Sequence, residues 1–377
     1  MKIMLVRDRN VLNTNWLIYF ANLLADSGHE VVIACDTYSK LGELAPSYKL
    51  GDGVRVANLN GKTDNALVNA YRKVRGKIGV PYFRFKRLIE EEKPDVIVCY
   101  FPVDLYNVTR LQNHNIPIIQ MMHCNPPMIL DKILKKTFIS RLWCLKSFKK
   151  VSVFQVLMPS FIDKINPIFA PKKIVAIGNP VQQYDSKDCV NLNNEHKKII
   201  YIARIEKANK RPHLLVEAFA KIAKEFPDWK VEIYGLQKYP EYDKEILDFV
   251  KNNSLEKQVF LMGYAKNILD VYKSADINAF TSAQEGFGLT LADGLALGIP
   301  AVGFDYASAV NELIINNYNG FLVSDTNDFA NKIKILITDK ELRIRMGKNA
   351  HKSMKEYAPE NIISQWNELL KETVSPK

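Results

Sequence analysis

The stretch 281–300 carries residue types that could bind a phosphorylated sugar. It reads TSAQEGFGLTLADGLALGIP, in which Glu285 precedes Gly286 and Gly288, and Asp293 follows further on. The glycines allow a tight turn and a close approach of backbone to a ligand. The apolar spacing after them predicts a helix, whose first N–H groups favour a phosphate. Because carboxylates beside such an anion site need hydroxyl groups or a cation as partners, the stretch predicts a site for a phosphorylated sugar.

Three further side chains follow predicted strands. Arg204 ends the apolar run IIYIAR, Lys210 lies in the loop after it, and His123 ends the run IPIIQMMH. In open α/β sheets, ligands gather at the carboxyl ends of the strands, so we expect all three side chains near a ligand. The two cations could neutralise a diphosphate leaving group without a metal ion. The sequence contains no Asp-x-Asp metal motif.

The elements that must position these residues alternate between short apolar runs and amphipathic segments. In the first half, we expect strands at 2–6, 30–36, 54–59, 95–101, 116–123, 151–160 and 173–181. The alternation restarts after a polar stretch at 182–198. Strands and helices in this order predict parallel sheets with right-handed crossovers. Because 377 residues suit two domains of ordinary size, we expect an α/β protein with two Rossmann-like parallel-sheet domains.

The composition is that of a soluble globular protein, with 47% hydrophobic and 25% charged residues. No apolar run approaches the ~20 residues of a membrane helix. The start MKIMLVRDRN shows neither the apolar core nor the small-residue cleavage site of a signal peptide, so none is expected. The five cysteines are scattered and lack metal-ligand spacing, which favours a cytoplasmic protein. A formal net charge of +11 indicates an acidic partner, and no nucleic-acid-binding motif accompanies it.

Two stretches concentrate the positive charge. Residues 71–87 hold seven Lys or Arg and no acid, and residues 129–150 form a candidate basic amphipathic helix. In this helix one apolar face is expected, with cations around it; the apolar residues are Ile133, Leu134, Phe138, Leu142 and Leu145, and the cations are Lys135, Lys136, Arg141, Lys146 and Lys149. The helix would either contact an anionic membrane or cover the sheet with its basic face in solvent.

A family resemblance rests on the string EGFGL at 285–289, on the second acid that follows Glu285 after seven residues, and on GIP at 298–300. This string resembles the E-x7-E signature of retaining nucleotide-sugar glycosyltransferases of family 4, which have the two-domain GT-B fold. The segment AVNELIINNYNGFLV follows at the family's distance. Arg204 and Lys210 resemble the family's G-R-x-x-x-x-K pair, with LLVEAF after the lysine, and GNP at 178–180 resembles its hinge.

The resemblance implies a domain plan. Residues 1–181 would form an acceptor-binding domain and residues 182–355 a nucleotide-sugar-binding domain, and the two would face an interdomain cleft. Residues 356–377 would form a helix that crosses back to the first domain.

The resemblance also implies roles for individual residues. Glu285 would bind hydroxyls of the donor sugar, Asp293 the ribose hydroxyls, and His123 would orient the sugar. Arg204, Lys210 and the helix start at Gly286, Phe287, Gly288 and Leu289 would neutralise the diphosphate. Gly263 and Tyr264 would line the base pocket through their backbone.

The sequence departs from the family pattern at three places. Asp293 replaces the usual glutamate and withdraws the carboxylate by one methylene, roughly 1.5 Å. Ala203 replaces a glycine, and the loop to Lys210 is one residue longer, which makes Lys207 a rival for its role. Val11-Leu12 stand where the family has a glycine pair; Asn13 and Asn15 could cap the following helix instead.

We therefore expect a retaining glycosyltransferase that moves a hexose or N-acetylhexosamine from a nucleotide diphosphate sugar, UDP rather than GDP. The expected acceptor is a lipid-linked or surface-polysaccharide intermediate, at the inner face of an anionic membrane. No metal or cofactor is expected, because Arg204, Lys210 and the helix start could neutralise the diphosphate. No strong protein base is expected either, because the departing phosphate could itself take the acceptor's proton. Two alternatives stay open: a GT-B nucleotide-sugar epimerase or hydrolase, and a non-catalytic nucleotide-sugar-binding protein.

Overall fold

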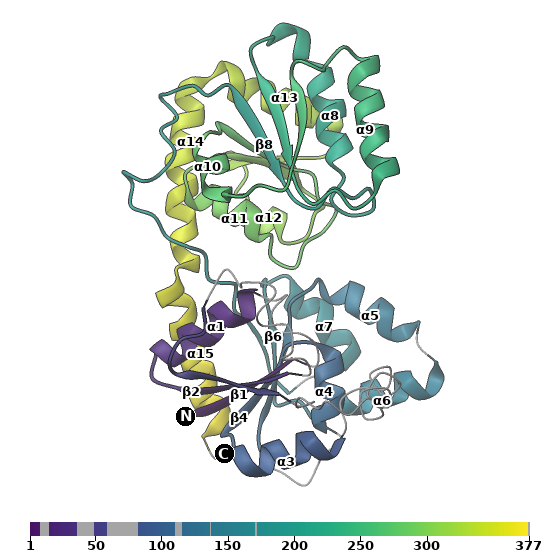
Figure 1. Cartoon of the computed structure of the whole chain (residues 1–377), viewed down its shortest axis with the longest axis vertical. Coiled ribbons are helices and arrows are strands. Elements are labelled where there is room, and N and C mark those ends of the chain that lie inside the picture. The colour runs from purple at the N-terminus through teal and green to yellow at the C-terminus, as the bar shows by residue number, and fades with distance from the viewer. Residues whose placement is uncertain are drawn as a thin grey trace, which may run out of the picture. The chain divides into compact units, whose positions relative to one another are not determined.

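The computed structural model describes residues 1–7, 15–35, 49–58, 82–109, 115–135, 137–169 and 172–375. The chain divides into two compact units, which we call unit 1 and unit 2. Unit 1 comprises Met1–Gly178 and Ile362–Lys377, and unit 2 comprises Asn179–Asn361. Each unit is built around a parallel sheet with helices on its faces (Figure 1). The predicted pair of parallel-sheet α/β domains is therefore confirmed.

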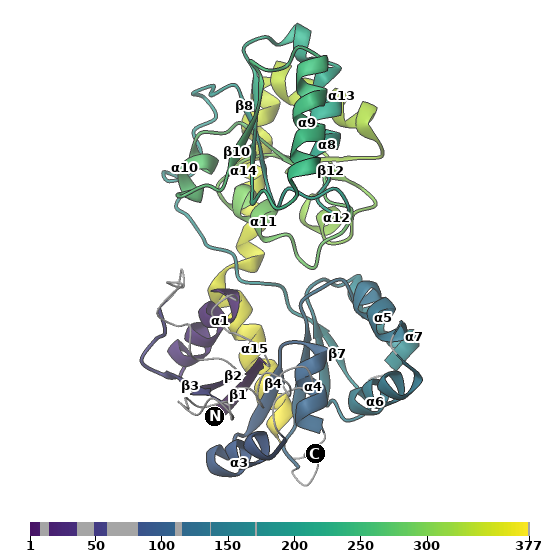
Figure 2. The ribbon, with the colours of Figure 1, turned by 45° about the vertical axis from the view of Figure 1, so that its right-hand side comes forward.

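The sheet of unit 1 has the strand order β3-β2-β1-β4-β5-β6-β7, and every pair is parallel. The strands are β1 (Lys2–Arg7), β2 (Glu30–Cys35), β3 (Val54–Asn58), β4 (Val96–Cys99), β5 (Ile118–Met122), β6 (Val153–Val156) and β7 (Ile174–Ala176). Figure 2 shows β3, β2, β1 and β4 side by side. The order changes direction between β1 and β4. The carboxyl ends of these two strands therefore flank the crevice where sheets of this kind bind ligands.

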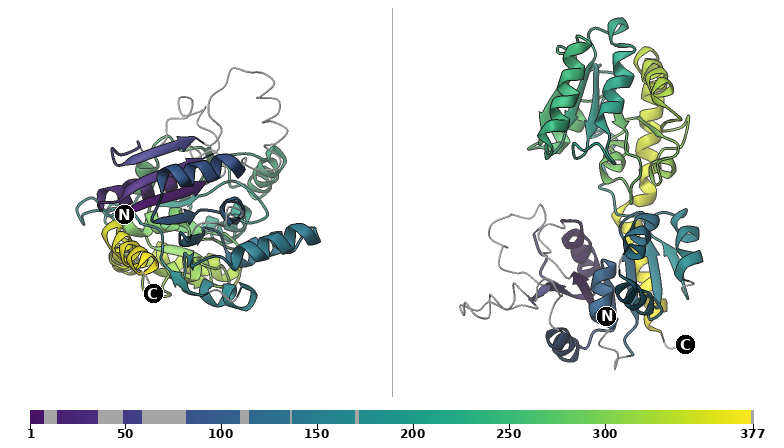
Figure 3. Two further views of the ribbon diagram at one scale, coloured as in Figure 1. Left: turned by 90° about the horizontal axis from the view of Figure 1, so that it is seen from below. Right: turned by 90° about the vertical axis from the view of Figure 1, so that its right-hand side faces the viewer.

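The helices of unit 1 are α1 (Asn15–Asp26), α3 (Tyr82–Glu92), α4 (Pro102–Thr109), α5 (Pro126–Leu134), α6 (Phe138–Phe148), α7 (Phe161–Phe169) and α15 (Pro359–Val374). The last of these comes from the far end of the chain and packs on the first helix. The Phe20 and Trp366 rings lie 4.8 Å apart, and His29 Nε2 lies 2.8 Å from Asn367 Oδ1. Figures 1 and 3 show α15 beside the N-terminal elements of unit 1.

The predicted single helix over 129–150 is wrong. Lys135 ends α5, and Thr137 takes an extended backbone conformation (φ −54°, ψ 151°) before α6 begins. The break lets the two helices orient independently. Ile133 is consequently buried in the core, whereas Phe138 and Leu142 are exposed, so these residues do not share one face.

The sheet of unit 2 has the order β10-β9-β8-β11-β12-β13, again parallel throughout. Its strands are β8 (Lys198–Ile202), β9 (Lys230–Tyr234), β10 (Val259–Gly263), β11 (Ile277–Phe280), β12 (Ala301–Phe304) and β13 (Gly320–Val323). Its helices are α8 (Pro212–Ala220), α9 (Pro240–Asn252), α10 (Ile268–Lys273), α11 (Leu289–Ala296), α12 (Val310–Leu313), α13 (Thr326–Thr338) and α14 (Lys340–Ser353). The direction changes between β8 and β11.

In the described ranges, no helix combines the length and the apolar character that crossing a bilayer requires.

Candidate functional site

The carboxyl ends of β8 and β11 are joined by a clamp of hydrogen bonds. The Asn209 side chain donates to Gln284 O (3.1 Å) and accepts from Gln284 N (3.2 Å). Ala283 N donates to Asn209 O (2.7 Å), and Thr281 Oγ1 donates to Lys210 O (2.8 Å). These bonds fix the loop after β8 against the loop after β11, at the point where the strand order reverses. The stretch 281–300 and the loop of Lys210 therefore form one site.

Lys210 and Glu285 form an ion pair in this site. Lys210 Nζ donates to Glu285 Oε1, and the two side chains are only 14% and 13% exposed. The Tyr201 hydroxyl donates to Lys210 O (2.9 Å) and fixes the backbone of the lysine. Two residues that were predicted to bind different parts of one ligand thus contact each other. A mostly buried pair of this kind holds both charges in place for a ligand that offers phosphate and hydroxyl groups.

Lys207, the rival of Lys210, points elsewhere. Its Nζ lies 2.5 Å from Glu245 Oε1 of α9, and both side chains are exposed. Arg204 is 63% exposed, and its Nη1 lies 3.6 Å from Glu206 Oε2. The structure thus brings Lys210 and not Lys207 to Glu285, and leaves the Arg204 guanidinium at the surface.

The start of α11 is fixed by the neighbouring elements. Gly288 precedes the helix with φ +94°, a conformation that favours glycine. Thr290 Oγ1 donates to Ile202 O (2.9 Å) at the end of β8, and the Tyr272 hydroxyl donates to Thr290 O (2.8 Å). Gly294 allows the helix to lie close to the sheet, since a Cβ there would come within 2.4 Å of Asn278 Nδ2. The first N–H groups of α11 are therefore held at the carboxyl edge.

The residues around this helix start differ in exposure. The Phe287 ring is buried and packs edge-on against Tyr357, with centroids 5.1 Å apart. Leu289 is among the exposed apolar side chains, and Gly286 lies in the bend just before Phe287. Contact of a ligand with the Phe287 position would therefore involve the backbone.

Asp293 lies on α11 and is half-buried. Its burial raises the pKa of the carboxyl to about 7. Among the described residues, no hydrogen-bond donor meets this carboxylate. Burying a carboxylate without donors is unfavourable, so the position suits a ligand that brings hydroxyl groups to it.

Gly263 ends β10, and Tyr264 follows it. Gly263 has φ +73° and its carbonyl accepts from Gly235 N (2.9 Å), whereas the Tyr264 side chain is 81% exposed. Gly235 itself was missed by the sequence reasoning. A Cβ there would lie 1.8 Å from Ala203 O, so this glycine provides the close approach next to Ala203.

Arg211 was also missed, and it has a structural role. It takes a left-handed conformation (φ 51°) before α8, and its Nε donates to Thr281 O (3.1 Å). Its Nη2 donates to the Tyr306 hydroxyl (2.9 Å), and its guanidinium lies 5.3 Å from the Phe304 ring centroid. These contacts add to the Asn209 clamp. No local pattern in the sequence indicates a role for Gly235 or Arg211, because the residues that they contact come from distant strands.

His123 belongs to unit 1 and follows β5. Its ring stacks on Tyr100 (4.4 Å between centroids) and lies 4.2 Å from the Trp16 ring. Burial lowers the pKa of His123 to about 3, so the imidazole is neutral at pH 7. Its Nε2 is buried and has no hydrogen-bond partner among the described residues. Val11-Leu12 and Asn13 lie outside the described residues, as do residues 71–81; Asn15 is the first residue of α1.

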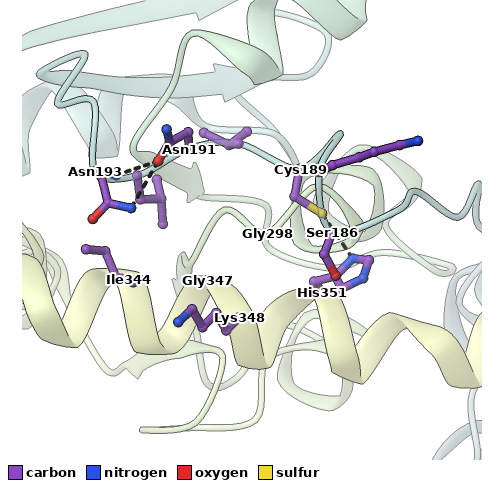
Figure 4. A pocket seen from close by; sticks show the side chains of 12 residues that line it. Ser186, Cys189, Asn191, Asn193, Gly298, Ile344, Gly347, Lys348 and His351 are labelled. Carbon is purple, nitrogen blue, oxygen red and sulfur yellow. Dashed lines mark hydrogen bonds between the residues drawn. The ribbon is translucent and has the colours of Figure 1, made fainter.

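A cavity of about 480 Å³ lies elsewhere in unit 2, between the linker 186–193 and α14 (Figure 4). Cys189 and His351 meet there, with 3.3 Å between Sγ and Nδ1. The same Nδ1 donates to Ala296 O (2.8 Å), so it cannot take the thiol proton, and burial raises the pKa of Cys189. The pair is therefore not an activated nucleophile. None of the predicted site residues lines this cavity. Nowhere in the described ranges do three or more His, Cys, Asp or Glu gather so that they could hold a metal ion.

Both halves of the chain match known families. Residues 14–182 match the family described as Glycosyltransferase Family 4, and residues 183–353 match the family described as Glycosyl transferases group 1.

Two bacterial relatives and one solved structure illustrate the similarity. The chain is 24% identical to the "GalNAc-alpha-(1->4)-GalNAc-alpha-(1->3)-diNAcBac-PP-undecaprenol alpha-1,4-N-acetyl-D-galactosaminyltransferase" of Campylobacter jejuni, over 94% of each chain. It is 25% identical to the "Poly(ribitol-phosphate) alpha-N-acetylglucosaminyltransferase" of Staphylococcus aureus, over 82% of this chain and 61% of the other. The crystal structure of Anabaena HepE in complex with UDP and glucose superposes with a TM-score of 0.72, at 17% identity, over 98% of this chain and 99% of the other.

Proposed function

Because the chain is a glycosyltransferase of the GT-B fold, we propose that it transfers a hexose or N-acetylhexosamine from a UDP-sugar to a lipid-linked or surface-polysaccharide acceptor, with retention of the anomeric configuration. The observation that carries this proposal is the clamped pair of loops in unit 2. They bring Lys210 and Glu285 together at the switch point of the sheet, beside the start of α11.

The donor would use each part of this site. The diphosphate would contact Lys210 and the N–H groups at the start of α11, while the exposed Arg204 would turn onto it. Glu285 would accept hydroxyls of the sugar, and Asp293 those of the ribose. Gly263 and Tyr264 would contact the base. The phosphate would draw Lys210 away from Glu285. Hydroxyls of the sugar would then take the place of Lys210 at the Glu285 carboxylate.

The transfer itself would need no strong protein base. The acceptor oxygen attacks C1 of the sugar as the bond from C1 to the diphosphate oxygen breaks. The departing diphosphate takes the proton of the acceptor hydroxyl, which leaves UDP and the glycoside. The cations at the diphosphate would stabilise its developing charge. A neutral His123 fits a role in orienting the sugar and not one as a charged acid.

The names of the relatives support the donor and the acceptor class. HepE was crystallised with UDP and glucose, and the Campylobacter relative is named for an undecaprenol-linked acceptor. The Staphylococcus relative is named for a poly(ribitol-phosphate) acceptor. Acceptors of these kinds belong to surface polysaccharides and their lipid-linked precursors.

A membrane contact through α6 is part of the proposal. Phe138 is 70% exposed, and Leu142 and Trp143 are also exposed on this helix. Lys146 lies 5.6 Å from the Trp143 ring centroid, and Lys149 follows at the end of the helix. Exposed aromatic and basic side chains on one helix are typical of contact with an anionic membrane surface. Ile133 cannot contribute, because it is buried.

A thermal-shift screen of UDP-, GDP- and ADP-sugars tests the donor. A ligand at 100 times its dissociation constant stabilises the folded state by about 2.7 kcal/mol, so the UDP-sugar should raise the melting temperature measurably. A larger rise with GDP-sugars would contradict the choice of base, and no rise with any nucleotide sugar would contradict the donor site.

Product analysis tests the reaction. Release of UDP should depend on added acceptor; release without acceptor would favour a hydrolase or epimerase. The anomeric proton coupling of the purified product should match that of the donor sugar. Activity should persist in EDTA, and its loss would show that a metal ion is required.

A further inference from the structure

Unit 1 contains a second group of polar side chains at a switch point, between β1 and β4. Arg7 ends β1, Tyr100 and Phe101 follow β4, and His123 follows β5. Trp16 of α1 completes the group. We refer to these five residues as the Arg7 cluster. Their position is the one where open parallel sheets bind ligands.

Three nitrogens of the Arg7 cluster are buried without a hydrogen-bond partner. They are Arg7 Nε, Trp16 Nε1 and His123 Nε2. Buried polar groups nearly always have a partner, because an unpaired one loses its hydration without compensation. Three such groups in one cluster indicate that the cluster is completed by something other than the described residues.

The three nitrogens belong to one contiguous set of contacts. Arg7 Cζ lies 4.5 Å from the Phe101 ring centroid and 5.5 Å from that of Tyr100. The Tyr100 ring lies 5.9 Å from the Trp16 ring and 4.4 Å from the His123 ring. Tyr100 therefore touches all three side chains that carry an unpaired nitrogen.

The chemistry of the cluster favours a negatively charged ligand. The guanidinium of Arg7 and the indole of Trp16 can only donate hydrogen bonds. No carboxylate in the described part of unit 1 lies within ion-pair distance of Arg7. Asp104 lies on α4, and its Oδ2 accepts from Phe101 N (2.6 Å). A charge-assisted bond to an oxyanion would satisfy the donors and the charge of Arg7 together.

We propose that the Arg7 cluster is an oxyanion subsite for the acceptor, so that the acceptor carries a phosphate or carboxylate group next to the reacting sugar. Arg7 Nε and Trp16 Nε1 donate to this group, and the rings of Tyr100 and Phe101 hold the guanidinium in place. This inference rests on the proposed function, since it assigns the acceptor of the same reaction.

The test uses the full chain labelled with ¹⁵N-tryptophan. The sequence has four tryptophans, so four indole N–H signals are expected, and a Trp16→Phe variant assigns one of them. Saturating UDP is present throughout, so that the phosphate site of unit 2 is filled. The probes are glucose, glucose 1-phosphate and glucuronate. The Trp16 signal should shift at concentrations at least tenfold lower with an acidic probe than with glucose. A larger shift with glucose 1-phosphate would indicate a phosphate on the acceptor, and a larger shift with glucuronate would indicate a carboxylate.

Two variants of Arg7 sharpen the result. Arg7→Met keeps the apolar stem and should weaken the response to acidic probes at least tenfold, while Arg7→Lys should retain part of it. Lys86→Met, an exposed lysine of the same unit, should change nothing. Equal responses to glucose and the acidic probes, or an unmoved Trp16 signal, would overturn the inference even if a variant fails to fold, because these outcomes are read on the wild type.

The experiment distinguishes failure of the oxyanion subsite from failure of the proposed function. UDP binding is measured in the same samples by the rise in melting temperature. If UDP binds and the Trp16 signal does not move, the oxyanion subsite is refuted and the proposed function stands. If UDP does not bind and the acidic probes move Trp16, the proposed function is refuted, and the Arg7 cluster is an anion site with no acceptor role.

Discussion

The two units place charged side chains at equivalent switch points and treat them differently. In unit 2, Lys210 is paired with Glu285, and the Asn209 clamp fixes both loops. In unit 1, Arg7 has no acidic partner among the described residues, and three nitrogens of its cluster are unpaired. The Lys210–Glu285 pair is thus formed without a ligand, whereas the Arg7 cluster leaves nitrogens for a ligand to bind. Preorganisation of the Lys210–Glu285 site would lower the free-energy cost of binding the donor.

Removal of Glu285 is the largest expected change. Glu285→Ala should reduce turnover to less than a tenth of wild type, because in the proposed binding mode the carboxylate contacts the sugar. UDP affinity should stay within a few-fold, since Lys210 remains for the phosphates. Acceptor-dependent UDP release and UDP titration measure the two quantities. Glu285→Gln, which keeps the size of the side chain, controls for packing. Turnover above a tenth in Glu285→Ala would remove the residue from the catalytic site.

Lys210 and Lys207 provide a matched pair. Lys210→Ala should weaken UDP binding by about 1.5–3 kcal/mol, the range for a hydrogen bond to a charged group. Arg204→Ala should act in the same direction. Lys207→Ala removes an exposed ion pair with Glu245, worth roughly 0–1 kcal/mol, and should leave UDP affinity unchanged. Uridine without phosphates should bind all of these proteins alike. The reverse pattern between the two lysines would move the phosphate role to Lys207.

The clamp itself can be tested through Asn209. Asn209→Ala removes the side-chain bonds to Gln284 and should lower the free energy of unfolding by about 1–3 kcal/mol. Affinity for the UDP-sugar should fall by a few-fold, because the loops must then be ordered on binding. Asn253→Ala, whose side chain donates only to Phe249 O of its own helix, is the control for stability. Unchanged donor affinity in Asn209→Ala would show that preorganisation of unit 2 is unimportant.

We expect the basic face of α6, in unit 1, to bind an anionic membrane. Near an anionic membrane, each Lys or Arg contributes about 1 kcal/mol, and the effect decays within a Debye length. Binding to anionic vesicles should therefore exceed binding to zwitterionic vesicles and fall with salt. Lys146→Glu with Lys149→Glu should release the protein without unfolding it. Salt-independent binding, or equal binding to both vesicle types, would contradict the electrostatic explanation.

Asp293 should make the stability of the chain depend on pH. Its pKa lies near 7 in the folded chain, against an ordinary value of 3.8. Between these values the unfolded state ionises and the folded state keeps the proton. The free energy of unfolding should therefore fall as the pH rises from about 4 to about 7. Asp293→Asn should flatten this fall in denaturant titrations, and equal slopes in the two proteins would show that the carboxyl is not buried.

The sequence was sufficient for the parallel sheets and for the neighbourhood of Glu285. Buried parallel strands read as apolar runs, and a glycine turn before a helix leaves a local pattern. The rule that ligand-binding residues follow strands predicted Lys210 and Glu285 at the same sheet edge, but not their ion pair. These features are local, or follow from the alternation of strands and helices.

Other features were beyond sequence reasoning, because distant residues determine them. The break at Thr137 depends on how α5 and α6 pack, and the apolar periodicity runs through it. The choice between Lys207 and Lys210 depends on a loop whose length differs from the family pattern. The Arg7 cluster joins residues from three strand ends and a helix, and no spacing in the sequence indicates that Trp16 contacts His123.

The position of α15 in unit 1 has a consequence for the order of synthesis. Trp366 packs against Phe20, so the core of unit 1 includes residues that emerge from the ribosome after all of unit 2. Unit 2 is continuous in the sequence and can fold as soon as it has been made. Unit 1 reaches its final form only afterwards, which reverses the usual order in which domains fold from the N-terminus onward. A released chain that ends at residue 361 would thus contain all of unit 2 and an incomplete unit 1.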